Sequence, residues 1–99
     1  MNRHNLGIIN GIIKKSGDVI QPLLPDLPNH PYRQAQTHLY TEIKYRFGKP
    51  LKEIRDSRFD DVIKLIQICC EHATEIELDK YFDWLEPEPP NPTLDDFLQ

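Results

Sequence analysis

The stretch that decides the fold is PYRQAQTHLYTEIKYRFGKPLKEIRDSRFDDVIKLI, residues 31–66. Its first half carries one apolar stripe at helical spacing, formed by Tyr32, Ala35, Leu39, Ile43 and Phe47. Pro31 is well placed as a first helical residue, and Gly48 followed by Pro50 is typical of a helix end. The stretch therefore predicts an amphipathic helix that begins at Pro31 and stops at Gly48.

A second helix is predicted after a short connector, residues 49–56, in which Leu51 and Ile54 point inward. Ser57, with Asp60 three residues later, is a suitable N-cap for this helix. Its predicted core face consists of Phe59, Val62, Ile63, Ile66, Cys70 and Ala73. Three more apolar side chains widen that face: Leu65, Ile68 and Cys69. The helix is therefore either central to the core or also in contact with a partner.

Residues 4–16, before this stretch, fit two structures. Leu6, Ile9 and Ile13 fall at helical spacing, with Gly17 as a natural stop. Asn10-Gly11 between two Ile-Ile pairs is also typical of a β-hairpin turn. The lysines at 14 and 15 favour the helix, because cations stabilise a helix C-terminus.

Residues 18–30 are predicted to form an extended proline-rich strap. Prolines recur there at every third position, which is typical of a polyproline-like conformation: Pro22, Pro25, Pro28 and Pro31. The apolar residues of this segment are expected to lie across the helices: Val19, Ile20, Leu23, Leu24 and Leu27.

After the central stretch, Thr74 and Glu77 form a capping-box pattern that predicts one more short helix. Its apolar residues are Leu78, Tyr81, Phe82 and Leu85, with the single tryptophan at Trp84. Residues 87–99 contain too little apolar area to order themselves, so they are predicted to be a flexible acidic tail behind a domain of residues 1–86. Removing residues 87–99 should then leave the melting temperature nearly unchanged.

Charge is divided unevenly along the chain of 99 residues. Residues 1–65 carry eleven Lys and Arg against seven Asp and Glu, a net of +4, while residues 66–99 carry one Lys against nine acids, a net of −8. Either the basic body meets an external anion, or the acidic end folds back and screens the body. Composition leaves both alternatives open.

Several classes of protein are disfavoured. No run approaches the roughly 20 apolar residues of a membrane span, and the N-terminus lacks the pattern of a signal peptide, so a cytoplasmic protein is expected. Cys69 and Cys70 cannot build a disulfide framework, and their apolar surroundings indicate unreactive thiols. His72 with Glu75 lacks further ligands at metal-site spacing. We expect no cofactor and no enzymatic activity.

A cationic and aromatic stripe flanks the first helix of the central stretch, where Arg33, Tyr40 and Lys44 follow one another at helical spacing. Such a stripe is usually a solvated face, but it could also lie along a phosphate backbone and stack on a base. The residues that would hold nucleic acid are Arg33, Tyr40, Lys44, Lys49, Lys52, Arg55 and Arg58.

The end of the tail is similar to a short linear motif. Leu94, Asp95 and Phe97 match the bacterial sliding-clamp-binding peptide, roughly Gln-Leu-Asp/Ser-Leu-Phe, while Thr93 and Asp96 depart from it. The acidic, phenylalanine-containing end also resembles the tip of bacterial single-stranded-DNA-binding proteins. The alternative is a solubilising end with no partner.

Residues 6–66 resemble the C-terminal domain of phage antirepressors and Rha-type phage regulatory proteins. The residues that carry the resemblance are Tyr40, Ile43, Lys44, Phe47, Gly48, Ile54, Phe59, Val62, Ile63 and Ile66. The chain departs from the family at Lys49-Pro50, where valine usually follows the Phe-Gly pair. The resemblance implies a helical fold and a phage or prophage regulatory role.

Together these patterns predict an all-α bundle of three to four helices with a proline-rich strap and a disordered acidic tail. The predicted function is a small phage-type regulatory or accessory protein that binds a host or phage protein. Its partner would contact Leu65, Ile68, Trp84, Leu94, Asp95 and Phe97. The alternative is a nucleic-acid-binding accessory protein whose tail recruits a replication protein such as the sliding clamp. The oligomeric state stays open, with a dimer as one alternative.

Overall fold

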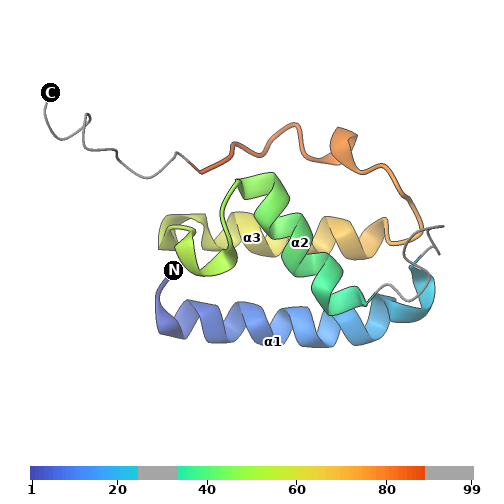
Figure 1. The fold of residues 1–99 in the computed structure, drawn as a ribbon, viewed down its shortest axis with the longest axis horizontal. Helices are drawn as coiled ribbons and strands as arrows, with labels where there is room; N and C mark the ends of the chain where they lie inside the picture. Colours follow the sequence, from blue (N-terminus) through green and yellow to red (C-terminus); the bar gives the residue numbers. More distant parts are fainter. Residues whose placement is uncertain (25–33, 89–99) are drawn as a thin grey trace, which may run out of the picture.

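Three α-helices dominate the residues that the structure, a computed structural model, describes: 1–24 and 34–88 (Figure 1). They are α1 (Arg3–Ile20), α2 (Ala35–Phe47) and α3 (Phe59–Glu71). Single 3₁₀ turns join or follow them: η1 (Gln21–Leu23), η2 (Leu51–Glu53), η3 (Asp56–Arg58) and η4 (Asp79–Tyr81). Within the described ranges there is no strand, and the all-α prediction is confirmed.

Helix α1 passes straight through Asn10-Gly11, so the helical alternative for residues 4–16 is confirmed and the hairpin is excluded. Its N-cap is Asn2, whose side chain accepts the backbone N–H of Asn5 at 2.8 Å. The predicted stop at Gly17 is wrong. Gly17 packs against α2, where a Cβ would lie 2.6 Å from Cγ of Gln36, so this glycine permits a close helix contact.

The predicted strap is also wrong over its first residues. Residues 18–20 complete α1, Ile20 is buried, and η1 follows with Pro22 in its first turn. A proline is tolerated there because the first N–H groups of a helical turn have no partner within the helix. Residues 25–33, which include the rest of the strap and Arg33, lie outside the described residues.

Helix α2 confirms the central pattern, since Ala35, Leu39, Ile43 and Phe47 are all buried. It begins at Ala35 and not at Pro31, because Gln34 has an extended backbone (φ −89°, ψ 125°). The side chain of Gln21 accepts the N–H of Ala35 at 2.7 Å. The predicted end is confirmed: Gly48 has φ +79°, and its N–H bonds to the carbonyl of Lys44.

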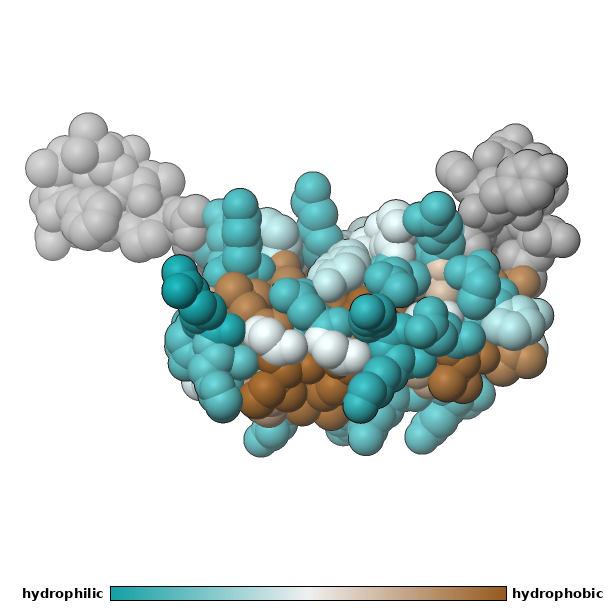
Figure 2. All heavy atoms as spheres, turned by 90° about the horizontal axis from the view of Figure 1, so that it is seen from below, coloured by the Kyte–Doolittle hydropathy of each residue, from teal (hydrophilic) through white to brown (hydrophobic). Residues whose placement is uncertain are grey.

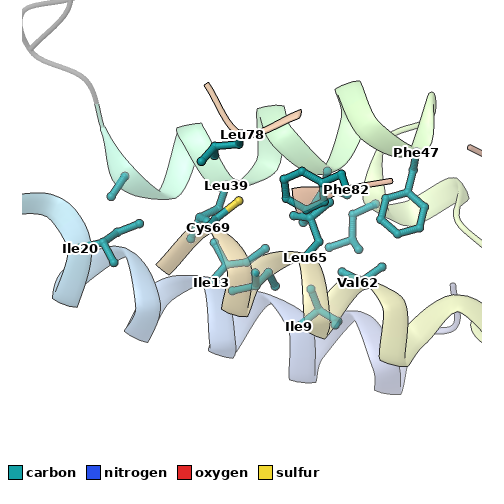
Figure 3. Packing of buried hydrophobic residues seen from close by; sticks show 14 of the residues in the cluster. Ile9, Ile13, Ile20, Leu39, Phe47, Val62, Leu65, Cys69, Leu78 and Phe82 are labelled. Atoms are coloured by element: carbon teal, nitrogen blue, oxygen red, sulfur yellow. The ribbon is translucent and has the colours of Figure 1, made fainter. Parts of the chain in front are cut away.

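Helix α3 begins at Phe59 after η3, and no side chain caps its first turn, so the predicted Ser57 cap is wrong. Its fully buried residues are Val62, Leu65, Ile66 and Cys69, while Phe59, Ile63 and Cys70 are half-buried. The apolar arc is wide because α1, α2 and the C-terminal segment all pack against this helix. Figure 3 shows Leu65 and Cys69 in one cluster with Leu39, Leu78 and Phe82.

Residues 72–88 return along the bundle as an irregular segment (Figure 1). The predicted fourth helix is wrong, because only the turn η4 forms there and Thr74 and Glu77 cap no helix. Leu78 and Phe82 are nevertheless buried, as their spacing indicated. The segment reaches Glu88, whose N–H donates to the carbonyl of Phe47 at 2.7 Å. Contacts with the body therefore extend past the predicted boundary at 86.

Candidate binding surface

The acidic C-terminal segment uses Glu88 to hold two arginines of the body. Arg55 Nε lies 3.0 Å from Glu88 Oε2, and Arg58 Nη1 lies 2.8 Å from Glu88 Oε1. The Glu88 side chain is 1% exposed. Burial by itself raises the pKa of Glu88, but the hydrogen bonds from Arg55 and Arg58 outweigh it and lower the pKa overall.

Arg58 is the centre of this cluster. Besides Glu88 it donates to Asp61 Oδ2 at 2.7 Å and to the carbonyl of Glu86 at 2.7 Å, and its guanidinium lies 4.9 Å from the ring centre of Phe47. Arg55 and Arg58, both predicted to hold phosphates, are thus occupied by the chain's own acid. At this end of the bundle the second alternative for the uneven charge applies: the acidic end screens the body.

Arg46 also binds the C-terminal segment, through Asp79. Sequence analysis did not identify Arg46 as a contact residue. Its guanidinium bonds to Glu42 at 3.0 Å and to Asp79 at 2.6 Å, and it lies 4.4 Å from the ring centre of Phe82. Burial lowers the pKa of Arg46, but the bonds to Asp79 and Glu42 raise it overall. The i, i+4 spacing of Glu42 and Arg46 was the available signal, whereas the Asp79 contact spans 33 positions.

The remaining residues predicted to hold nucleic acid lie on separate elements. Tyr40 and Lys44 are exposed on α2, and the Tyr40 hydroxyl donates to Asn10 of α1 at 2.6 Å. The part of the Tyr40 side chain that is buried loses hydration, which raises the pKa of its hydroxyl. Lys52 is exposed in the connector, where its carbonyl accepts the N-terminal ammonium at 2.9 Å, while Lys49 is half-buried.

Of the residues predicted to contact a partner protein, Leu65 is 0% exposed and belongs to the core. It is unavailable to a partner because α2 and the C-terminal segment cover that side of α3. Ile68 is half-buried. Trp84 is also half-buried, with its Nε1 donating to the carbonyl of Tyr81 at 2.8 Å and Lys64 Nζ 4.2 Å from its ring centre. Leu94, Asp95 and Phe97 lie outside the described residues.

A polar cluster closes the turn after α3. His72 Nδ1 and Glu75 Oε2 are 2.6 Å apart, and the Tyr81 ring stacks on His72 with centroids 3.7 Å apart. The Tyr81 hydroxyl donates to Glu75, which lowers the pKa of Glu75 and raises that of Tyr81. Across residues 1–24 and 34–88, no group of three His, Cys, Asp or Glu side chains could hold a metal ion.

Among the described residues, an open groove with a volume of about 460 Å³ lies between α1 and α3. Its walls are Ile12, Ser16, Ile63, Ile66, Gln67, Cys70 and Glu71. Ile8, 40% exposed, and Val19, 69% exposed, lie four positions before and seven after Ile12, on the same side of α1. Figure 2 views the molecule from the α1 side and shows apolar side chains gathered in patches along it. We call this surface, the groove with Ile8 and Val19, the groove face.

Sequence analysis did not identify the groove face as a site. It assigned Ile9 and Ile13 only to a helical spacing, and the structure buries both. Each belongs to an Ile-Ile pair whose other member lies on another side of the helix. The unused signal was the second member of each pair, Ile8 and Ile12, because adjacent helical residues point about 100° apart. Burial of the Cys70 thiol in the groove wall raises its pKa, which keeps it protonated and unreactive.

No family model matches this chain, and it has no match among the curated proteins or the solved structures. In the part of the chain that the structure describes, none of the helices has the length and apolar character that crossing a membrane requires.

Proposed function

We propose that this protein is a non-catalytic binding module that recognises another protein through the groove face. The observation that carries the proposal is the pairing of an apolar groove with exposed apolar side chains on the same side of α1. Exposed Ile8 and Val19 add nothing to the core, and contiguous apolar surface of this kind marks binding sites on proteins. Apolar residues at spacings of four and seven on one helix suit a helical or extended partner segment.

The charges of the domain support a protein partner better than a nucleic acid. Arg46, Arg55 and Arg58 are each paired with acids of the C-terminal segment, so a phosphate would have to displace a bond of 2.6 to 3.0 Å. Arginine is the side chain best suited to two-pronged phosphate contacts. The groove face, by contrast, offers apolar area without such competition.

We further propose the regulatory class that the resemblance implies, a phage- or prophage-encoded protein of the antirepressor type that inhibits or redirects a host or phage protein. The matching residues Ile43, Phe47 and Gly48 have core and turn roles in α2. They therefore support a shared fold more directly than a shared partner.

The test is capture of a partner from nuclease-treated bacterial lysate. The full chain is compared with a double variant, Ile8→Glu with Val19→Glu, and with Ile76→Glu as the control, since Ile76 is an exposed apolar residue (64%) outside the groove face. We expect the full chain and the control to capture the same protein and the double variant to lose it. Equal capture by all three would reject the groove face as the binding surface.

The second candidate function is nucleic-acid binding with recruitment of a replication protein by the tail. Exposed Tyr40 and Lys44, one helical turn apart on α2, favour it. Affinity for single-stranded or duplex DNA should then fall steeply with salt, with a log–log slope near the number of phosphate contacts. Partner capture that survives nuclease and responds weakly to salt would reject this alternative.

A further inference from the structure

The two helices that form the groove face carry opposite charges along its edges. On α1, His4 and Lys15 share the side of Ile8 and Ile12, since they are spaced by four, three and seven positions from them. On α3, Asp60 is seven positions before Gln67, and Glu71 four after it, so both acids share the side of that groove residue. One edge of the groove therefore carries the Lys15 ammonium and the His4 imidazole, and the other carries two carboxylates.

These four edge residues are exposed, and none of the ion pairs among the described residues includes them. In this they differ from Arg46, Arg55 and Arg58, which are all paired within the chain. The charges at the edges of the groove are thus available to a partner.

The charged residues on the two edges also lie at similar positions along the axes of α1 and α3. Asn2 N–H donates to Asp56 at 2.6 Å near one end, and Ser16 and Cys70 line the same groove further along; the residues of each pair are 54 positions apart. Helices α1 and α3 therefore run in the same direction (Figure 1). By this register Lys15 is offset from Glu71, and His4 from Asp60, by only about two residues, or about 3 Å along the axis.

Gly11 lies between Ile8 and Lys15 on the same side of α1, and a Cβ built there would meet no atom within 4 Å. Glycine inside a helix costs about 1 kcal/mol relative to alanine. No contact within the described residues requires a glycine at this position, in contrast to Gly17. The absence of a side chain at Gly11 would allow a partner to approach the backbone of α1 closely.

We propose that the groove face binds a second copy of this chain, with the twofold axis running parallel to the groove. Such an axis places the basic edge of α1 over the acidic edge of the second copy's α3, so Lys15 meets Glu71 and His4 meets Asp60, twice in each dimer. An interface of this kind is self-complementary, as a closed symmetric dimer requires. A twofold axis across the groove would instead set the basic α1 edges against each other. This inference rests on the groove face of the proposed function and names its occupant.

The test is a charge exchange followed by sedimentation equilibrium of the full chain from micromolar to millimolar concentration. The variants are Lys15→Glu, Glu71→Lys and the two together, and Lys14→Glu is the control. Lys14 is exposed and adjacent to Lys15, but it points about 100° away around α1. Circular dichroism of each variant confirms that the helices are retained.

We expect the unmodified chain and the control to dimerise equally. Each single variant should raise the dimer dissociation constant about tenfold, because two symmetric charge pairs, each contributing up to about 1 kcal/mol, become repulsive. The double variant should recover most of the affinity, since the exchanged charges again face each other. Rising salt should weaken the dimer of the unmodified chain.

A chain that stays monomeric up to millimolar concentration overturns the inference, as does a double variant that dimerises more weakly than either single variant. Failure of this inference can be distinguished from failure of the proposed function. If the chain is monomeric but Ile8→Glu with Val19→Glu abolishes capture of a lysate protein, the groove face binds a different protein, and only the second copy is rejected. If the chain dimerises and captures no lysate protein, the second copy is supported as the occupant of the groove face, and recognition of a different protein is rejected.

Discussion

At the scale of single residues, Glu88 joins the acidic C-terminal segment to two arginines of the body. It lies in a stretch that composition assigned to a flexible tail, yet its carboxylate is buried between Arg55 and Arg58. A buried charge is tolerated when it is fully hydrogen-bonded, and Glu88 accepts from both guanidinium groups and from the N–H of Arg55. Removing only the charge isolates its contribution.

We predict that Glu88→Gln lowers the free energy of unfolding by about 1–3 kcal/mol, because the amide cannot replace charge-assisted bonds to two guanidinium groups. Urea denaturation measures the change. Glu86→Gln is the matched control, since only the main-chain carbonyl of Glu86 bonds to Arg58 and its side chain is exposed. Equal stability of the two variants would show that the cluster contributes nothing.

The effect of Glu88 should depend on pH in a defined direction. Its pKa in the folded protein is lowered from 4.5, so its stabilisation is complete above that value and is lost as pH falls through the folded-state pKa. The stability difference between the unmodified protein and Glu88→Gln should thus be full at neutral pH and shrink below about pH 4. Because Asp56 and Glu75 also have lowered pKa values, only this difference, and not total acid sensitivity, reports on Glu88.

At the scale of elements, α1 shows how one residue type has different roles in one helix. Gly7 and Gly17 are both inside α1, but a Cβ built at Gly7 would meet no atom within 4 Å, whereas one at Gly17 would collide with Gln36 on α2. Glycine therefore lowers the helix propensity of the N-terminal half of α1, and no packing contact at Gly7 requires a glycine there. The C-terminal half uses glycine to bring α1 and α2 together.

We predict opposite effects of alanine at these two positions. Gly7→Ala should stabilise the protein by about 0.5–1 kcal/mol through helix propensity alone. Gly17→Ala should destabilise it by about 1–3 kcal/mol, since the new Cβ would force Gln36 and α2 to shift. Thermal unfolding of both variants at one protein concentration checks this. A gain in stability at Gly17 would contradict the close packing of α1 on α2.

At the scale of the whole molecule, the C-terminal segment, residues 72–88, packs across the bundle and stabilises it. Residues 72–88 contribute Leu78 and Phe82 to the core, and Asp79 and Glu88 to the arginines of α2 and the connector. The acidic end of the chain therefore stabilises the body as well as neutralising part of its charge. The surface that we propose for recognition, the groove face, is formed by α1 and α3.

Two truncations distinguish the contribution of the C-terminal segment, residues 72–88, from that of the residues after it. A chain ending at Glu86 loses Glu88 and should melt on the order of 10 °C lower, given about 4–8 °C for each kcal/mol in a domain of this size. A chain ending at Glu88 keeps every described contact and should retain the melting temperature of the full chain. Scanning calorimetry of the three chains decides the matter. Identical melting of the Glu86 and full chains would support the predicted domain boundary at residue 86.

The sequence by itself determined the features that depend on neighbours along the chain. Helical spacing identified the buried stripe of α2 and the inward Leu51 and Ile54. Gly48 marked the end of α2, because glycine reaches φ +79° without the steric strain that a Cβ adds. Leu78 and Phe82 were identified as apolar residues of a short amphipathic helix; that helix is absent, but both side chains are buried.

Only the tertiary structure decided the features that join distant segments. Glu88 meets Arg55 across 33 positions, Gly17 meets Gln36 on another helix, and the groove exists only because α1 and α3 lie side by side. Periodicity gives the direction of a side chain around its own helix, but not which segment lies opposite it. For that reason the sequence could propose Leu65 as a contact residue, and the packing of three neighbours around α3 placed it in the core.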